Sequence, residues 1–225
     1  MNKPEIISGI PRWVEAPVAF LALCLAAPLL MLLGTVIALT SPGPIIFRQK
    51  RVGLYGRLFT LYKLRTMHVS TAGPQVTARD DGRTTSVGRF LRKTKLDELP
   101  ELWNVFKGDM SIVGPRPEVP RYVDVSIVTW QEVLRARPGI TDPVTLKLRN
   151  EEVLLASVKG DRERYYLEKL QPYKLQGYKD YFENRGFWSD ISVLWKTLVA
   201  VILPDTSPPP TLAEIAISPS KRIAT

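Results

Sequence analysis

Cysteine and histidine are almost absent from this sequence, and their scarcity excludes several classes of site. Cys24 and His68 are the only examples among 225 residues, and Cys24 lies inside an apolar segment. One cysteine builds neither a disulfide framework nor a cysteine-based metal cluster, which fits a reducing, cytoplasm-facing location. One histidine excludes a multi-histidine zinc site and any conventional Ser/His/Asp triad that does not use His68.

Charge is absent from a long stretch near the N-terminus. No charged residue occurs from Ala16 to Phe47, and the 22 residues from Val18 to Leu39 are almost wholly apolar. About 20 such residues cross a bilayer as a helix, so we expect a membrane helix here. The segment is long for the core of a signal peptide, and no clear cleavage site follows it.

The residues alone leave two topologies open for this helix. Pro28 lies near its middle, where it removes a helical hydrogen bond and clashes with the carbonyl of Cys24, which favours a kink. Basic residues flank both ends, so the positive-inside rule favours a re-entrant helix with both ends on the cytoplasmic face. Proline is also tolerated in helices that span the membrane, which keeps a straight crossing open.

Positive charge is concentrated directly after this helix. The net charge is +9, and residues 48–100 carry 12 Lys and Arg against 4 acids. Such a strip attracts anionic lipid headgroups, phosphorylated substrates or nucleic acid. No nucleic-acid-binding motif accompanies it, so we expect no nucleic-acid partner.

The pattern after the membrane helix predicts an α+β fold that is mainly helical, with a short β-hairpin and amphipathic interface helices. The hairpin strands are expected around residues 45–49 and 58–63. We predict three parts: an N-terminal segment with the membrane helix at 1–47, a small cytoplasmic globular domain at 48–204, and a disordered tail at 205–225.

One apolar stripe near the C-terminus has two interpretations. Its members fall at alternating spacings of three and four residues: Trp188, Ile191, Trp195, Leu198 and Ile202. Such spacing places them on one face of a helix. The two tryptophans suit a membrane interface, and an ordinary core-packing helix fits the pattern equally well.

An acidic pair, Asp97 and Glu98, follows a basic helix predicted from residue 87. An isolated pair of this kind is usually a helix cap with a solvated neighbour. A helix that begins near Asp97 tolerates Pro100 in its first turn and places both carboxylates near free backbone N–H groups. A start at Thr94, with a capping box from Thr94 to Asp97, is the alternative and forces a kink at Pro100.

Basic residues around this pair are candidate phosphate ligands. Arg116 lies between two prolines, which restrict its backbone and present its planar guanidinium for bidentate phosphate binding. Four further candidates come from the hairpin region and from a second proline turn: Arg51, Lys63, Arg65 and Arg137. A solvated basic face is the alternative interpretation for Arg51, Lys63 and Arg65.

Three sequence blocks resemble the bacterial sugar transferases of the monotopic phosphoglycosyl transferase class. The blocks are SPGPIIFRQKRVGLYGRLFTLYKLRTM (41–67), VGRFLRKTKLDELPELWNVFKGDMSIVGPRPE (87–118) and RPGIT (137–141). The resemblance implies transfer of a sugar phosphate from a UDP-sugar to a polyprenyl phosphate such as undecaprenyl phosphate. The implied products are a polyprenyl diphosphate sugar and UMP, at the first membrane step of glycoconjugate assembly, for instance of exopolysaccharide or lipopolysaccharide.

The resemblance also implies roles for individual residues. Asp97 would be the nucleophile that forms an aspartyl-phosphosugar intermediate, Glu98 would support proton transfer or positioning, and Mg2+ is expected at Asp97. Arg116 and the four basic residues above would contact the substrate. A re-entrant helix with both ends cytoplasmic is implied as well, which places the protein in membrane lipids at the cytoplasmic face of the bacterial inner membrane.

Two departures from the family pattern limit what carries over. Ala27 precedes Pro28 where the family commonly has serine, and RPGIT continues into Asp142–Glu152 rather than into a Gly-Trp segment. The transferred sugar is therefore not predicted. The competing hypothesis, from another functional class, is a non-catalytic membrane adaptor whose basic strip binds anionic lipid.

Overall fold

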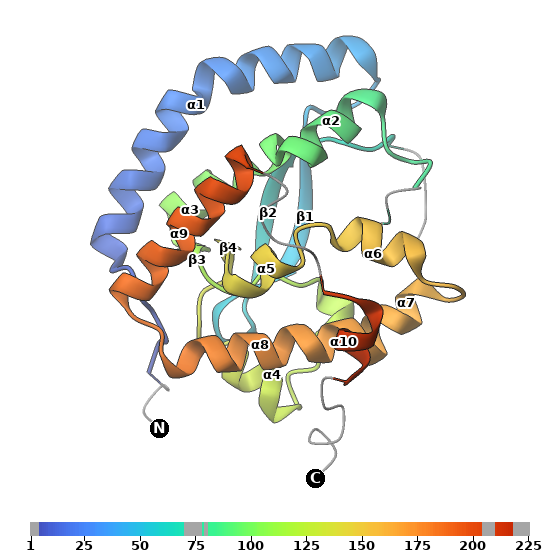
Figure 1. The fold of residues 1–225 in the computed structure, drawn as a ribbon. Coiled ribbons are helices and arrows are strands. Elements are labelled where there is room, and N and C mark those ends of the chain that lie inside the picture. The colour runs from blue at the N-terminus through green and yellow to red at the C-terminus, as the bar shows by residue number, and fades with distance from the viewer. Residues whose placement is uncertain (1–4, 70–77, 79–80, 204–209, 218–225) are drawn as a thin grey trace.

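The computed structural model describes residues 5–69, 78, 81–203 and 210–217. Its described part is mainly helical, with two small two-stranded sheets, as the sequence predicts. Figure 1 shows the long helix α1 on one side, the hairpin at the centre, and helices α4 to α8 around the remaining side. The helices are α1 Arg12–Thr40, α2 Ser86–Thr94, α3 Glu101–Lys107, α4 Val128–Val133, α5 Pro143–Lys147, α6 Glu151–Ser157, α7 Arg162–Tyr165, α8 Gln171–Glu183, α9 Phe187–Ile202 and α10 Leu212–Ile217.

Helix α1 includes the uncharged run and continues through Pro28. Figure 1 shows its ribbon changing direction part-way along, as the lost hydrogen bond of a mid-helix proline favours. One side of the helix packs on α3, where the rings of Phe20 and Phe106 lie 5.2 Å apart. Most of its apolar side chains are exposed, Leu25 and Leu39 among them. Within the described residues it is the one helix long and apolar enough to cross a membrane, and its re-entrant topology stays a prediction.

The predicted hairpin is confirmed. Strands β1 (Ile46–Val52) and β2 (Leu58–Leu64) pair antiparallel, with Ile46 opposite Leu64 and Val52 opposite Leu58. Phe59 and Leu61 alternate along β2 toward the core beneath α1, because successive side chains of a strand point to opposite faces. Lys63 lies on this same face of β2, two residues beyond Leu61, and its ammonium reaches Glu98 and Glu101.

A second, parallel pair joins two segments that are distant in sequence. Strand β3 (Ser111–Val113) pairs with β4 (Gly139–Thr141), and Gly139 N donates a hydrogen bond of 2.9 Å to Pro115 O. A side chain at Gly139 would lie 2.1 Å from the backbone nitrogen of Gly114, so only glycine permits this approach. The pairing fixes the start of the loop 114–118, which carries Arg116.

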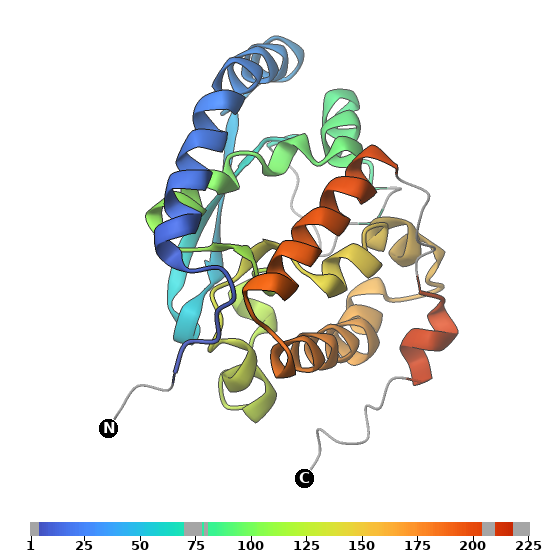
Figure 2. The same cartoon turned by 60° about the vertical axis from the view of Figure 1, so that its left-hand side comes forward.

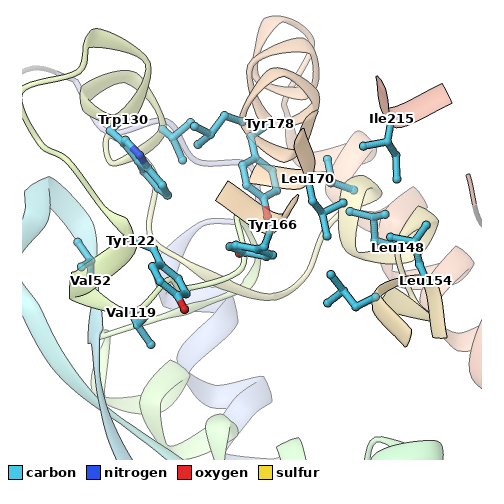
Figure 3. Close-up of a cluster of buried hydrophobic side chains, with 14 of the residues drawn as sticks. Val52, Val119, Tyr122, Trp130, Leu148, Leu154, Tyr166, Leu170, Tyr178 and Ile215 are labelled. Atoms are coloured by element: carbon cyan, nitrogen blue, oxygen red, sulfur yellow. The ribbon is translucent and has the colours of Figure 1, made fainter. Parts of the chain in front are cut away.

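The largest hydrophobic cluster lies between the hairpin and helices α4, α6 and α8 (Figure 3). Tyr122, Trp130, Tyr166 and Tyr178 are among its buried members. Aromatic side chains bury large areas while keeping a polar end, so this core also holds hydroxyl groups close to the charged interior.

Helix α9 does not bury the stripe predicted from its spacing. Trp188 and Trp195 are 78% and 66% exposed, and the other stripe residues are exposed as well. The buried positions are Asp190 and Val193 on the opposite side of the helix. Figure 2 shows α9 crossing the molecule with α1 to one side and α8 below it. The core-packing interpretation of the stripe is therefore wrong.

The predicted disorder of the tail is wrong for residues 212–217, which form α10. Ile215 in this helix is 1% exposed and joins the largest hydrophobic cluster. The Pro- and Ser-rich composition around it gives no sign of this helix. The rest of the predicted tail, apart from residues 210–211, lies outside the described residues.

Candidate active site

The Asp97–Glu98 pair lies in a short 3-10 turn, η2 (Leu96–Glu98), between α2 and α3. Lys95 ends α2 in the left-handed conformation, with φ of 60°, and Pro100 caps the start of α3. The predicted start at Thr94 is therefore wrong. A helical turn does begin near Asp97, as the 3-10 turn η2, and α3 itself begins at Glu101. Pro100 suits its position because the first helical N–H groups need no intrahelical partner.

The pair is buried rather than solvated. Asp97 is 6% and Glu98 9% exposed. Within the described part of the chain, Asp97 Oδ1 is buried and has no hydrogen-bond partner. An unsatisfied buried carboxylate oxygen is costly, so the helix-cap interpretation does not account for Asp97.

Three separate segments meet at Glu98. Its Oε1 accepts hydrogen bonds from Lys63 Nζ of β2 at 3.0 Å and from Arg116 Nη2 of the loop 114–118 at 2.6 Å. Lys63 Nζ also lies 3.0 Å from Oε1 of Glu101, at the start of α3. The fold thus brings three predicted site residues, Lys63, Glu98 and Arg116, into direct contact beside Asp97.

The surroundings of the two acids shift their pKa values in opposite directions. Burial raises the pKa of Asp97 above its ordinary value, although the Lys63 ammonium opposes this. Burial also disfavours the ionised form of Glu98, but the Arg116 guanidinium and Lys63 together hold the pKa of Glu98 well below its usual range. Glu98 therefore binds two cations, whereas Asp97 carries an oxygen that no described residue pairs with.

Arg51 lies behind the loop that carries Arg116. Its Nη1 donates to Pro117 O at 3.0 Å and lies 3.6 Å from Glu118 Oε1, while its Nη2 donates to Gln49 Oε1 at 2.7 Å. Its Nε is buried and has no hydrogen-bond partner among the residues that the structure describes. Arg51 therefore keeps one donor free inside the protein.

The fold does not bring the other two predicted ligands to this cluster. Arg65 Nη2 donates to Ser41 O at 2.6 Å and Arg65 Nη1 to Pro42 O at 3.0 Å, so Arg65 holds the turn after α1. Arg137 precedes β4 at the base of the loop 114–118, and in the described ranges its side chain forms no hydrogen bond or ion pair. Substrate contacts for both residues stay predictions.

Sequence reasoning missed Glu101 and Asn104. Glu101 is almost fully buried and shares Lys63 with Glu98; its spacing of three residues from Glu98 is a signal that could have identified it. Asn104 donates to Thr60 O at 2.7 Å and accepts from Tyr62 N at 3.2 Å, which ties α3 to β2 beside Lys63. No sequence signal distinguishes Asn104 from a surface asparagine.

Among the described acidic residues of this site, only Asp97 has a buried, unpaired oxygen that could bind Mg2+. In the described part of the chain, no group of three acidic, histidine or cysteine side chains is placed to hold a metal ion. Mg2+ commonly binds one or two carboxylates together with substrate phosphates and waters. The unpaired buried oxygen of Asp97 supplies one such ligand, while Glu98 and Glu101 are occupied by cations.

Comparison with known proteins assigns the chain, including this cluster, to a family. The family model described as bacterial sugar transferase matches residues 7–204. The chain belongs to this family. The match includes α1, the hairpin, the acidic pair and the loop 114–118, so every element of the site lies inside it.

Three relatives of this sugar transferase are named as transferases of different sugars. A UDP-glucose:undecaprenyl-phosphate glucose-1-phosphate transferase of Caulobacter vibrioides is 38% identical over 201 residues, which cover 87% of this chain and 71% of the relative. An undecaprenyl-phosphate galactose phosphotransferase of Salmonella typhimurium is 34% identical over 217 residues, 87% of this chain and 41% of the relative. A UDP-N-acetylgalactosamine-undecaprenyl-phosphate N-acetylgalactosaminephosphotransferase of Aeromonas hydrophila is 32% identical over 215 residues, 88% of this chain and 44% of the relative. This chain thus spans less than half the length of the last two.

Proposed function

We propose that this protein transfers a sugar phosphate from a UDP-sugar to undecaprenyl phosphate, in two steps through Asp97. The observation that carries the proposal is the unpaired, buried Oδ1 of Asp97 beside Lys63, Glu98 and Arg116. Family membership and the names of the relatives support the donor and the acceptor. They give no support to a non-catalytic adaptor.

In the first step, Asp97 Oδ1 attacks the phosphorus atom that carries the sugar. A bond forms between this oxygen and phosphorus, and the bond from phosphorus to the bridging oxygen of the diphosphate breaks, so UMP leaves. In the second step, a phosphate oxygen of undecaprenyl phosphate attacks the same phosphorus and releases Asp97 as a free carboxylate. The final product is undecaprenyl diphosphate sugar, and two simpler displacements replace one that must hold two bulky substrates together.

The cations around Glu98 supply the electrostatic part of this mechanism. Arg116 and Lys63 are held by one carboxylate oxygen, so they are oriented before the substrate arrives. Glu98 acts as a positioning residue, because its Oε1 binds both Lys63 Nζ and Arg116 Nη2. Bound at Asp97, Mg2+ would neutralise diphosphate charge and stabilise the departing UMP.

The acceptor is a membrane lipid, and two apolar surfaces support a place at the cytoplasmic face of the inner membrane. They are the exposed side of α1 and the exposed stripe of α9. We propose that α1 re-enters on the cytoplasmic side and that α9 lies in the membrane interface.

A quenching experiment tests the position of α9. Brominated lipid should quench the fluorescence of a variant whose single tryptophan is Trp188, and should not quench that of a variant whose single tryptophan is the buried Trp130. Residues 1–10 labelled from outside the cytoplasm would contradict the topology.

UMP release by purified membranes tests the function. The panel contains UDP-glucose, UDP-galactose and UDP-N-acetylgalactosamine, each with and without undecaprenyl phosphate. We expect release with at least one donor and, without acceptor, a protein mass increased by one sugar phosphate. The adduct should be absent in Asp97→Asn. An adduct that persists in this variant excludes Asp97 as the nucleophile, and no release from a broad donor panel excludes the transferase.

A further inference from the structure

A chain of buried polar contacts runs from the loop 114–118 into the helical layer. Tyr166 donates its hydroxyl hydrogen to Glu118 Oε2 in a short hydrogen bond. Glu118 Oε1 lies 3.6 Å from Arg51 Nη1, and Glu118 O accepts from Val52 N at 2.9 Å. Tyr166 is thus linked to Arg51 through one carboxylate.

Tyr166 begins a π-helical segment, Tyr166–Leu170, between α7 and α8. Such segments are rare and frequently occur at functional sites, because the wider turn redirects side chains. Figure 3 shows the Tyr166 ring inside the buried cluster near Tyr122 and Tyr178. Its ring centroid lies 5.6 Å from that of Tyr122, so packing fixes the ring while the hydroxyl reaches Glu118.

Lys174 and Glu151 lie at the other end of this series of polar contacts. Lys174 Nζ lies 4.8 Å from the centroid of the Tyr166 ring and 3.4 Å from its hydroxyl oxygen. The same ammonium lies 2.7 Å from Glu151 Oε2 of α6. Buried polar chains of this kind orient their members strongly, because each unsatisfied group is costly at low dielectric. Both neighbours therefore restrict where the Tyr166 hydroxyl can lie.

We propose that Tyr166 is a positioning residue for the donor, acting through Glu118 on Arg51. Its hydroxyl binds Glu118 Oε2 and so holds this carboxylate beside Arg51 Nη1, which also donates to Pro117 O. These contacts fix the loop next to Arg116, whose guanidinium would bind the diphosphate of the UDP-sugar. The inference rests on the proposed function and adds a donor-affinity role for a residue of the hydrophobic core.

The test compares Tyr166→Phe with Tyr165→Phe. Both changes remove one hydroxyl from adjacent tyrosines, and the Tyr165 hydroxyl is buried with no hydrogen-bond partner in the described residues. In Tyr166→Phe, Glu118 loses the hydroxyl that holds it beside Arg51, so the loop that carries Arg116 is held less firmly. We expect the KM for the UDP-sugar to rise about 10-fold with kcat within about 2-fold. Tyr165→Phe should match the wild type in both constants, and thermal unfolding should show that both variants are folded.

Binding of UDP, measured by calorimetry, makes the result independent of transfer. We expect Kd for UDP to rise about 10-fold in Tyr166→Phe and to stay unchanged in Tyr165→Phe. In an Arg51→Lys background, where one ammonium replaces the guanidinium that binds both Pro117 O and Gln49 Oε1, Tyr166→Phe should have no further effect. Equal UDP affinity in the two tyrosine variants, or additive effects with Arg51→Lys, would overturn the inference. Absence of UMP release from the wild type would instead overturn only the transferase mechanism.

Discussion

Two buried aspartates of this protein, Asp190 and Asp97, have opposite surroundings. Asp190 of α9 is fully buried, and both of its oxygens are used. Oδ1 accepts from Tyr181 and from Arg185 Nε, and Oδ2 accepts from Ile10 N at 3.1 Å and Arg185 Nη2 at 3.2 Å. Asp97 Oδ1 has no such partner among the described residues.

Under the proposed function, this difference distinguishes a structural carboxylate, Asp190, from the nucleophile, Asp97. Asp190 and Arg185 join the N-terminal segment, β3 and the α8–α9 connection, since Arg185 Nη2 also donates to Val113 O at 2.6 Å. A fully paired carboxylate has no free lone pair for a substrate. Asp97 retains one at the expense of stability, as expected of a nucleophile or metal ligand. The following variants test this distinction, from the largest effect to the smallest.

Asp97→Asn should lower UMP release by at least about 1000-fold, which corresponds to about 4 kcal/mol in the reaction barrier. It should not lower the melting temperature, because burial raises the pKa of Asp97 and thus disfavours the ionised side chain in the folded state. Thermal unfolding and UMP release measured on the same preparation test both statements. Activity within tenfold of the wild type would remove Asp97 from the mechanism.

Asp190→Asn should lower the free energy of unfolding by about 3–5 kcal/mol, because it leaves the buried Arg185 without its counter-charge. Denaturant unfolding in detergent measures the loss. Asp180→Asn is the matched control, since Asp180 accepts one exposed hydrogen bond on α8 and should change stability by less than about 0.5 kcal/mol. Similar values for the two variants would contradict a structural role for Asp190.

Lys63→Met should lower both stability and activity. Glu98 keeps Arg116, but Glu101 loses the cation that balances it while buried. We expect a loss of about 2–3 kcal/mol in unfolding free energy, together with reduced UMP release. Lys107→Met is the control, because the Lys107–Asp109 pair at 3.3 Å is partly exposed and contributes about 0–1 kcal/mol. A Lys63 variant that loses activity alone would show that Glu101 needs no counter-charge.

Asp142 provides a third case, a buried aspartate that caps a helix. Its Oδ1 accepts from Val144 N at 2.7 Å and Thr145 N at 3.0 Å at the start of α5. Burial raises the pKa of Asp142, so the wild type loses stability as pH rises above about 4 and through the folded-state pKa. Asp142→Asn keeps both hydrogen bonds and does not titrate. Its stability relative to the wild type should therefore increase from pH 4 to pH 7, on the order of 1 kcal/mol. A pH-independent difference in melting temperature would contradict this account.

Local patterns predicted much of the fold and the identity of the central residues. The hairpin, the basic helix α2 and the apolar helix α1 follow from periodicity and composition, which act over a few residues. Asp97, Glu98 and Arg116 were identified from the sequence blocks and lie together. Helix α10 was missed because the burial of Ile215 depends on residues distant in sequence.

The sequence by itself determined the apolar helix, the basic strip after it, the hairpin and the acidic pair, because each depends on residues close together in the chain. Only the tertiary structure decided which charges meet. Lys63 joins Glu98 and Glu101, while Arg65 holds the turn after α1. Pairing of β3 with β4 places the loop of Arg116 against η2. Burial and contact depend on segments that are distant in sequence, and they alone separate the unpaired Asp97 from the fully bonded Asp190.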